Sequence, residues 1–156
     1  MPDRHLVLHK REKDLTATDR RLLKRAMRNQ KLAYAPYSGF LVGVALRTNK
    51  GDIVDGANQE NASYPLCMCG ERVALYQSAM LHANAGIDTM AIVAHGRKKL
   101  KSPAPPCGAC LQVMREFESR QKNQPIRLLL KADTDLIWEV PSVAAMLPFS
   151  FDGSYL

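Results

Sequence analysis

Two short stretches decide the interpretation of this chain: Cys69-Gly70-Glu71-Arg72 and Pro106-Cys107-Gly108-Ala109-Cys110. Their three cysteines offer the number of protein ligands that a catalytic zinc takes while it keeps a fourth position for water. A Cys-x-x-Cys that opens a helix directs two sulfurs toward one ion, and the helix N-terminus favours their negative charge. Pro106 is typical of such a start. Glu71 adds a carboxylate that can move protons in the same pocket. The two stretches therefore predict a catalytic zinc site built from two helix starts.

Other interpretations of these residues remain open from spacing alone. A Cys-x-x-Cys by itself is equally typical of half a structural zinc site or of a redox pair. Cys67 is a rival ligand, but only Cys69 has a glutamate two residues later. Arg72 is either a surface arginine or a donor to ligand sulfurs that offsets the charge of three thiolates. The histidines have no spacing typical of ligands: His5, His9, His82 and His95.

Composition indicates one globular domain. The chain has 156 residues, of which 46% are apolar and 24% charged, and this content supports a sizeable core. We expect a flexible basic tail over residues 1–15 and a single domain over 16–156. The chain opens without the pattern of a secretory leader, and no apolar run approaches the roughly 18 residues needed to span a bilayer. A cytoplasmic, reducing location with thiols free for metal is expected, without membrane association.

The net charge of +7 is compatible with nucleic-acid binding or with a merely solvated surface. Much of the excess positive charge lies in two runs. The first run consists of Arg20, Arg21, Lys24, Arg25 and Arg28, and the second of Arg97, Lys98, Lys99 and Lys101. The first run lies on the polar face of a predicted helix, which favours the solvated interpretation. The second lies in a loop near the predicted metal site, and its role stays open.

Hydrophobic periodicity predicts helices alternating with strands. A helix capped by Thr16 or Thr18 carries an apolar stripe of Leu22, Leu23, Ala26 and Met27. Strands are predicted over 40–46 and 53–57, with a hairpin turn at 49–52. A second helix starts at Cys69 and carries Val73, Ala74, Tyr76, Ala79 and Met80.

The remaining predicted elements complete an α/β pattern. Two buried strands, 90–94 and 126–130, are expected to be parallel neighbours, because crossover connections are right-handed. A helix over 110–117 lies between them with Val113, Met114 and Phe117 inward, and a short helix is expected over 143–147. This order predicts a sheet with helices on its faces, so that the starts of the two cysteine-bearing helices meet at one edge.

Six motifs resemble, in order, those of the small homotetrameric zinc-dependent cytidine deaminases, from about residue 20 to the C-terminus. They are Ala35-Pro36-Tyr37-Ser38, Val42-Gly43, Asn58-Gln59-Glu60-Asn61-Ala62-Ser63-Tyr64, Cys69-Gly70-Glu71-Arg72, Pro106-Cys107-Gly108-Ala109-Cys110 and Leu147-Pro148-Phe149-Ser150-Phe151. A cysteine or histidine, a glutamate two residues later and a distant Pro-Cys-x-x-Cys form the known signature of zinc deaminases. The resemblance implies a three-layer α/β/α sandwich with a mixed central sheet of about five strands.

The resemblance also implies an activity. It is hydrolytic deamination of cytidine and 2′-deoxycytidine to uridine and 2′-deoxyuridine in pyrimidine salvage, with one Zn²⁺ per subunit. Zinc hydroxide would attack C4 of the base, and Glu71 would shuttle the proton. A homotetramer with shared active sites is implied, in which Ala62, Tyr64 and Phe151 reach a neighbouring subunit's pocket.

Substrate-binding roles transfer position by position from the same resemblance. Asn58 and Glu60 would hold the ribose 3′-hydroxyl, and an amide with a carboxylate recognises a buried hydroxyl strictly. Phe40 would flank the base, and the Gly70 N–H would bind the base carbonyl. Alone, Phe40 is equally typical of a core position and Asn58 of a turn.

The chain departs from the family pattern at several positions. Gly70 stands where alanine is usual, and Leu111 replaces an arginine, which places the compensation of ligand charge on Arg72. Pro105 takes the place of a serine whose carbonyl accepts the base amino group, and proline retains that carbonyl. The stretch 97–105 is a few residues longer than usual.

Three alternatives compete with a nucleoside deaminase. A deaminase of a base in a polynucleotide needs stacking platforms, but only 6% of residues are aromatic, which argues against nucleic acid. Nucleoside-antibiotic deaminases lack the pair formed by Asn58 and Glu60. A non-catalytic structural zinc domain would close its site with a fourth ligand, for which Cys67 is the candidate.

Overall fold

One mixed sheet forms the centre of the computed structural model, which describes residues 7–9 and 11–156. Within these residues the strand order is β1-β6-β5-β4-β2-β3, and only β4 and β5 are parallel. The strands are β1 (Val7–His9), β2 (Leu41–Thr48), β3 (Ile53–Ala57), β4 (Ile87–His95), β5 (Arg127–Lys131) and β6 (Ile137–Val140).

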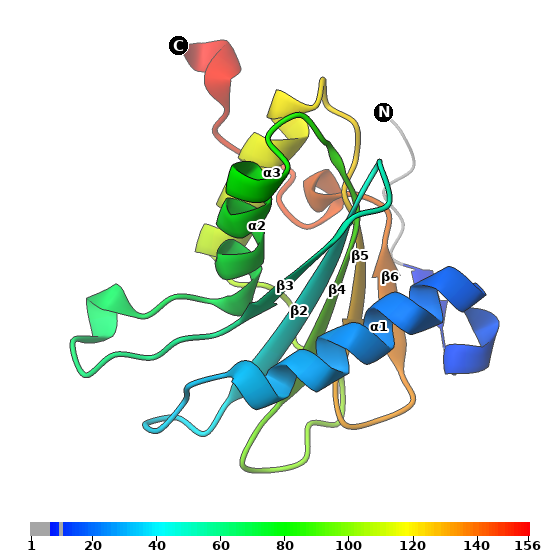
Figure 1. The fold of residues 1–156 in the computed structure, drawn as a ribbon, viewed down its shortest axis with the longest axis vertical. Coiled ribbons are helices and arrows are strands. Elements are labelled where there is room, and N and C mark those ends of the chain that lie inside the picture. The colour runs from blue at the N-terminus through cyan, green and yellow to red at the C-terminus, as the bar shows by residue number, and fades with distance from the viewer. Residues whose placement is uncertain (1–6, 10) are drawn as a thin grey trace.

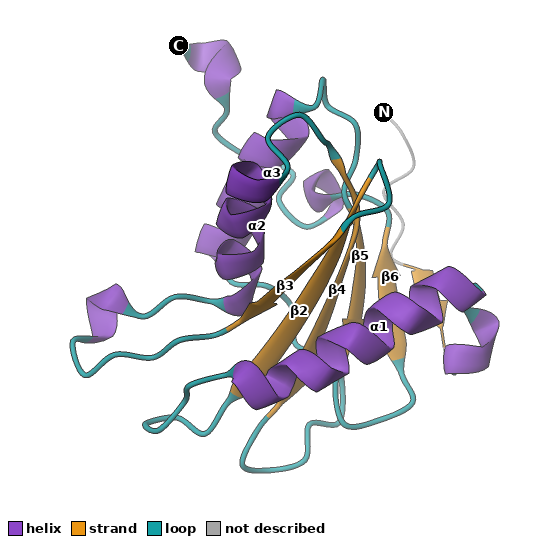
Figure 2. Cartoon of the chain, in the orientation of Figure 1, coloured by secondary structure: helices purple, strands orange, loops and turns teal. Residues whose placement is uncertain are grey.

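Helices cover both faces of this sheet. Helix α1 (Ala17–Asn29) crosses one face, whereas α2 (Gly70–Leu81) and α3 (Gly108–Arg120) lie side by side on the other (Figures 1 and 2). Short 3-10 turns occur at Glu12–Asp14, Gln30–Leu32, Tyr64–Leu66, Val143–Ala145 and Gly153–Tyr155. The predicted three-layer α/β/α sandwich is therefore confirmed. Within the described part of the chain, no helix combines the length and apolarity needed to cross a membrane.

Alternation along the strands divides the core into two clusters. On β2, Val44 and Leu46 face α2 and α3, while Ala45 between them faces α1. The same period of two on β4 sends Met90 and Ile92 to one cluster and Ala91 to the other. Each strand therefore contributes apolar side chains to both helical layers, which explains the nearly continuous apolar runs in the central strands.

Helix α1 begins where the sequence predicts. The Thr16 hydroxyl accepts a hydrogen bond from the Asp19 N–H at 3.1 Å and caps the helix. Leu22, Leu23 and Ala26 are buried against the sheet. Met27, expected in the same stripe, is 39% exposed, because Asp19 and Asn29 complete the buried face of this helix instead.

The pair of parallel strands brings the two helix starts together. β4 and β5 pair in parallel from Thr89 opposite Arg127 to Val93 opposite Lys131, as predicted. The predicted hairpin joins β2 and β3, whose turn is closed by a hydrogen bond from the Thr48 N–H to the Asp52 carbonyl at 2.9 Å. Since α3 is the crossover between β4 and β5, its first residue lies at the same end of the sheet as that of α2 (Figure 1).

The two ends of the chain differ most from the predicted elements. The sequence predicts a tail over residues 1–15, of which 1–6 and 10 lie outside the described residues. Within the described part, Val7–His9 pairs with β6 and Leu15 is buried. Strand β6 was not predicted; its four residues pair with β5, and β1 covers its other edge. The central five strands match the expected number, and β1 is a short sixth. The helix expected over 143–147 is a 3-10 turn at Val143–Ala145.

A partly buried ion pair joins α1 to the sheet and gives a stability prediction. Asp19 is buried and accepts a hydrogen bond from Arg127 at 2.5 Å. Burial alone would raise the pKa of Asp19, but hydrogen bonds from Arg127 and Thr16 outweigh it and hold the pKa below 3.8. A carboxylate with a lowered folded-state pKa stabilises the fold above its unfolded pKa, and this stability is lost as the pH falls through the folded value.

We therefore expect Asp19→Asn to lower the free energy of unfolding at pH 7 by about 1.5–3 kcal/mol, the range for hydrogen bonds to charged groups. At pH 3 the difference from the wild type should be smaller, because this pH lies below the ordinary pKa of the carboxyl group in the unfolded chain, and the native state then loses part of the stabilisation. Urea denaturation at both pH values measures it, with the exposed Asp135→Asn as control. Equal effects at both pH values would contradict the assignment.

Candidate active site

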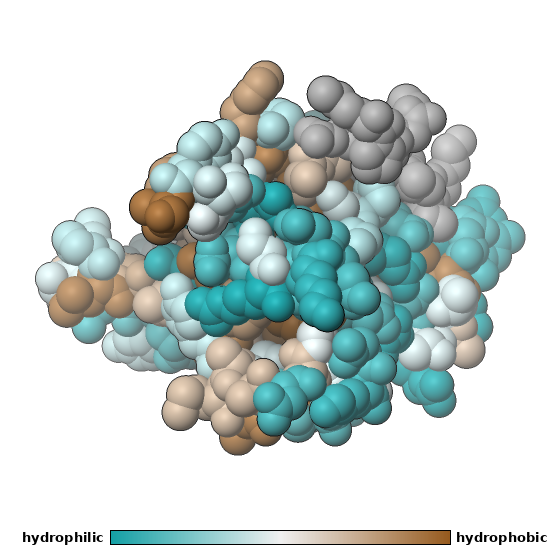
Figure 3. All heavy atoms as spheres, turned by 90° about the horizontal axis from the view of Figure 1, so that it is seen from above, coloured by the Kyte–Doolittle hydropathy of each residue, from teal (hydrophilic) through white to brown (hydrophobic). Residues whose placement is uncertain are grey.

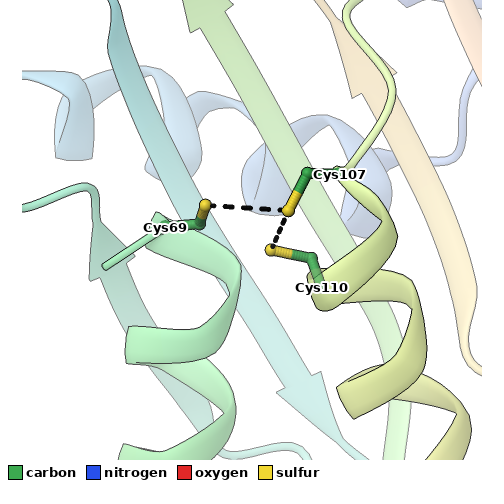
Figure 4. A group of neighbouring side chains, drawn as sticks. All are labelled: Cys69, Cys107 and Cys110. Atoms are coloured by element: carbon green, nitrogen blue, oxygen red, sulfur yellow. Dashed lines mark hydrogen bonds between the residues drawn. The ribbon is translucent and has the colours of Figure 1, made fainter. Parts of the chain in front are cut away.

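Three cysteine sulfurs converge between the starts of α2 and α3 (Figure 4). Cys69 and Cys107 are the residues directly before the two helices, and both have extended backbone angles. Cys110 follows in the first turn of α3 and is fully buried. The Sγ atoms of Cys69 and Cys107 are 3.9 Å apart, and those of Cys107 and Cys110 are 3.5 Å apart. Both cysteines that precede a helix thus direct their sulfurs toward the one inside α3.

This geometry fits zinc. Tetrahedral coordination with Zn–S bonds of about 2.3 Å places sulfurs about 3.8 Å apart, close to both observed distances. All three sulfurs lie within 4.8 Å of one another, and all four cysteines of the chain are free thiols. Three protein ligands leave one tetrahedral position for water or substrate, as in catalytic rather than structural sites.

The electrostatics of the three thiols also favour a cation. A hydrogen bond from Cys110, followed by contacts with Arg72 and Cys107, lowers the pKa of Cys69 to about 5 despite partial burial. The bond to Cys69 and burial raise the pKa of Cys110 instead. One thiol of the cluster therefore ionises easily while its buried neighbour resists, and a divalent cation would let all of them bind as thiolates.

Cys67 lies outside the sulfur cluster. Its Sγ accepts a hydrogen bond from the Asn61 N–H at 3.2 Å and is 3.6 Å from the Asn61 carbonyl oxygen. The thiol thus holds the segment that precedes α2 in a local turn. The group of potential metal ligands that the described residues form contains only the other three cysteines.

Glu71 is buried beside the sulfurs, in the first turn of α2. It is 5% exposed and lines the same cavity as Cys69 and Cys107. Burial, with a smaller contribution from the charge of Cys69, raises the pKa of Glu71 to about 6. A carboxyl group with a pKa near neutrality can both accept and donate a proton, which suits general acid–base work.

Arg72 is the positive group in contact with the sulfurs. Its Nη2 lies 3.7 Å from the Sγ of Cys69, and the sulfurs of Cys69 and Cys110 raise the pKa of the guanidinium. Its Nε is buried without a hydrogen-bond partner among the described residues. Leu111 packs in the core between the sheet and the two helices α2 and α3. Arg72 is thus placed to offset the charge of the thiolates.

We expect Arg72→Gln to weaken zinc binding by about 10- to 100-fold, the usual effect of removing a group that supports metal ligands. Competition with a chromophoric chelator measures the affinity. Arg120→Gln is the matched control, because it removes the same charge from α3, where Arg120 stacks on Phe117 with 4.6 Å from its guanidinium carbon to the ring centroid. Equal affinities for the wild type and Arg72→Gln would assign Arg72 a surface role.

A cavity of about 180 Å³ opens beside the sulfurs. Its walls come from the start of β2, the end of β3, the second half of β4 and the segment before α3. The lining residues are Phe40, Val42, Asn58, Cys69, Glu71, Ile92, Ala94, Ala104, Pro105 and Cys107. The volume lies below the range of about 300–1,000 Å³ typical of drug-sized ligands. Its size and apolar walls suit a single flat ring placed against Cys69 and Glu71.

The structure separates the predicted substrate-binding residues into two groups. Phe40 and Asn58 line the cavity, and Gly70 lies beside it at the first position of α2, where helix N–H groups lack intrahelical partners. Asn58 donates to the Phe40 carbonyl at 2.8 Å and accepts from the Val42 N–H at 2.8 Å. Its amide therefore joins the ends of β2 and β3 in the cavity wall.

The second group does not line this cavity. Glu60 accepts hydrogen bonds from the backbone of Tyr37 and Ser38. Ala62 and Tyr64 lie on an arm that projects from the body of the molecule, and hydrophobic residues show at this edge in Figure 3. Phe151 is 58% exposed in the C-terminal segment, stacked on Tyr155. Within one chain, none of these four residues lines the cavity.

Some cavity residues were missed by the sequence analysis. Val42, Ile92, Ala94 and Ala104 line the cavity but were not predicted as site residues. Their signal is the period of two along a strand, since Ile92 and Ala94 on β4 share a face, as do Phe40 and Val42 at the start of β2.

Comparison with known proteins supports the same interpretation. Residues 16–123 match the family model described as the cytidine and deoxycytidylate deaminase zinc-binding region. The chain is 46% identical over 96 residues to the cytidine deaminase of Halalkalibacterium halodurans, covering 62% of this chain and 69% of that protein. It is 36% identical over 132 residues to the cytidine deaminase of Sporosarcina psychrophila, covering 84% and 89%.

A solved structure shows the same fold. The crystal structure of cytidine deaminase from Burkholderia pseudomallei aligns with a TM-score of 0.73 and 36% identity, covering 88% of this chain and 100% of that one. The matched region contains Cys69, Glu71, Cys107 and Cys110. The chain therefore belongs to the cytidine and deoxycytidylate deaminase zinc-binding family.

Proposed function

We propose that this protein catalyses the hydrolytic deamination of cytidine and 2′-deoxycytidine to uridine and 2′-deoxyuridine. The observation that carries the proposal is the burial of Glu71 in one cavity with the sulfurs of Cys69 and Cys107, at the size of a single ring. The reaction consumes water and releases ammonia, because the bond from C4 to the amino nitrogen breaks and a C4 carbonyl forms. Named cytidine deaminases among the relatives favour the same substrate.

Cys69, Cys107 and Cys110 would hold the Zn²⁺, one ion per subunit. When bound, zinc supplies Lewis acidity that makes a water molecule reactive at neutral pH. Glu71 accepts the proton of the attacking water, delivers it to the ring nitrogen next to C4 and then assists the departure of ammonia. Its pKa of about 6 supports this role, since both protonation states are accessible near neutral pH.

Substrate recognition is proposed to divide between base and sugar. Phe40 flanks the base, and the Gly70 N–H binds the base carbonyl. Asn58 and Glu60 hold the ribose 3′-hydroxyl at the cavity mouth. The cavity volume supports this division, because 180 Å³ suits the base alone, and of the two proposed sugar-binding residues only Asn58 lines the cavity.

We also propose a homotetramer with shared active sites. Ala62 and Tyr64 on the arm and Phe151 in the C-terminal segment would each complete a neighbouring subunit's pocket. The exposure of apolar side chains supports this: Tyr64 is 69% and Met80 83% exposed, and Leu66 and Phe149 are also exposed. Large apolar side chains gathered on a surface are typical of interfaces. Light scattering of the purified protein measures the oligomeric state.

Cytoplasmic pyrimidine salvage is the proposed setting, with free nucleosides rather than nucleic acid or membranes as partners. The four free thiols agree with a reducing compartment. Zinc removal tests the activity. We expect zinc-replete protein to consume cytidine and 2′-deoxycytidine in an absorbance assay. Chelator-treated protein should consume neither nucleoside until zinc is restored. If zinc-replete protein consumes neither nucleoside, the proposed function is wrong.

A further inference from the structure

We propose that Arg97, in the long loop between β4 and α3, is a positioning residue that sets the selectivity for the sugar 3′-hydroxyl by fixing the turn on which Glu60 rests. This inference rests on the proposed function and names a residue that the family resemblance does not. The turn is Tyr37–Gly39, between α1 and β2. The turn and the Arg97 loop lie at the same end of the sheet (Figure 1).

Glu60 is held in place by the backbone of this turn. Its Oε2 accepts hydrogen bonds from the Tyr37 N–H at 2.9 Å and the Ser38 N–H at 3.2 Å. The Ser38 hydroxyl, these two N–H groups and the positive charge of Arg97 hold the pKa of the half-buried Glu60 carboxyl below its usual value. The orientation of the carboxylate therefore depends on the turn rather than on the neighbours of Glu60 in the chain.

Arg97 holds the other side of the same turn. Its Nη2 donates to the Tyr37 carbonyl at 2.9 Å, so the Tyr37 peptide groups contact Glu60 through an N–H and Arg97 through an oxygen. Gly39 has φ of +64°, and a Cβ there would lie 2.6 Å from Nε and 2.7 Å from Cγ of Arg97. The arginine side chain thus lies directly on the turn, where the positive φ at position 39 favours glycine.

The loop that carries Arg97 is itself anchored. Asp133 hydrogen-bonds the His95 ring at 2.5 Å before Arg97 and accepts from the Leu100 N–H at 2.8 Å after it. Arg97 therefore projects from a segment fixed on both sides to the body of the protein. Arg97 and the other basic residues of this loop, Lys98, Lys99 and Lys101, are all exposed, and of these four only Arg97 has a hydrogen bond to the turn.

The turn is also connected to the cavity, through Phe40, and to the projecting arm, through Tyr64. Phe40, which lines the cavity, directly follows Gly39, and the Phe40 carbonyl accepts from Asn58. The Tyr37 ring packs edge-on against Tyr64 of the projecting arm, with ring centroids 5.9 Å apart. A shift of the turn would therefore move Glu60 relative to Asn58, and these are the two residues proposed to hold the 3′-hydroxyl.

The test measures how Arg97→Ala changes recognition of the 3′-hydroxyl. Inhibition constants are measured for uridine and 3′-deoxyuridine, because both report binding without turnover. In Arg97→Ala we expect uridine to bind about 5- to 20-fold more weakly, because the charge-assisted hydrogen bond from the 3′-hydroxyl to Glu60 is weakened but not removed. The analogue 3′-deoxyuridine, which lacks this hydroxyl, should bind nearly as in the wild type. KM for cytidine should rise by a similar factor, with less change in kcat.

Three variants separate this role from general effects. Lys98→Ala removes a charge from the same loop and should leave the inhibition ratio unchanged. Arg97→Lys should restore part of the selectivity. Gly39→Ala places a methyl group against Arg97 and should reproduce the loss. The melting temperature and oligomeric state are compared with those of the wild type.

The proposal is overturned if Arg97→Ala weakens both ligands equally, changes neither, or is matched by Lys98→Ala. These outcomes are distinct from failure of the proposed function, in which zinc-replete wild-type protein would neither deaminate cytidine nor bind uridine.

Discussion

Replacing Glu71 by glutamine is expected to lower kcat for cytidine by about 10²- to 10⁴-fold, the usual contribution of general acid–base catalysis. The amide has nearly the same shape as the carboxyl group but cannot accept the proton of the attacking water. Glu71 is buried beside the sulfurs, so bulk water cannot easily replace it as a proton carrier. The substitution therefore slows the chemical step and leaves the shape of the cavity almost unchanged.

Zinc content distinguishes this loss from a loss of structure. We expect Glu71→Gln to keep one zinc per chain, because the three sulfurs that form the metal cluster are intact. Glu116→Gln is the matched control: this exposed glutamate on α3 lies 3.7 Å from Arg120, and its change should leave kcat as in the wild type. Full activity of Glu71→Gln would assign the proton transfer to another group, and joint loss of zinc and activity would indicate a structural role.

The features that the sequence predicted well are those set by nearby residues. Thr16 caps α1 through a residue three positions away, and Cys107 and Cys110 share one helix turn. The convergence of Cys69 with them needs only that two crossovers place helix starts at one end of the sheet. Such patterns depend on periodicity and chirality, which can be read from a single chain.

The features that escaped prediction depend on distant partners. Strand β6 has four residues and no clear alternation, and it is a strand because β5 and β1 pair with it. Tyr76 and Met80 are apolar but exposed, since the buried face of α2 is formed by Ala74, Leu75 and Ser78 instead. The setting of Glu60 was equally hidden, because its hydrogen-bond donors lie more than twenty residues earlier in the chain.

Removing one sulfur should have an effect as large as removing Glu71, but through the metal. Cys107 is the best position to test, because it is exposed and precedes α3, whereas Cys110 is fully buried and its truncation would also leave a cavity in the core. We expect Cys107→Ala to weaken zinc binding by more than about 100-fold, the upper end of the effect of losing a group that only supports a ligand. Zinc content after dialysis against a chelator, and cytidine consumption, measure the result.

Cys67→Ala is the matched control, since it removes a thiol two residues from a ligand. The Cys67 sulfur bonds the Asn61 backbone and lies outside the metal group, so this variant should keep its zinc and most of its activity. If the protein were a structural zinc domain with Cys67 as its fourth ligand, Cys67→Ala would instead weaken zinc binding as strongly as Cys107→Ala. The two single substitutions thus decide whether the ion keeps an open position, and an open position is what hydrolysis at this site requires.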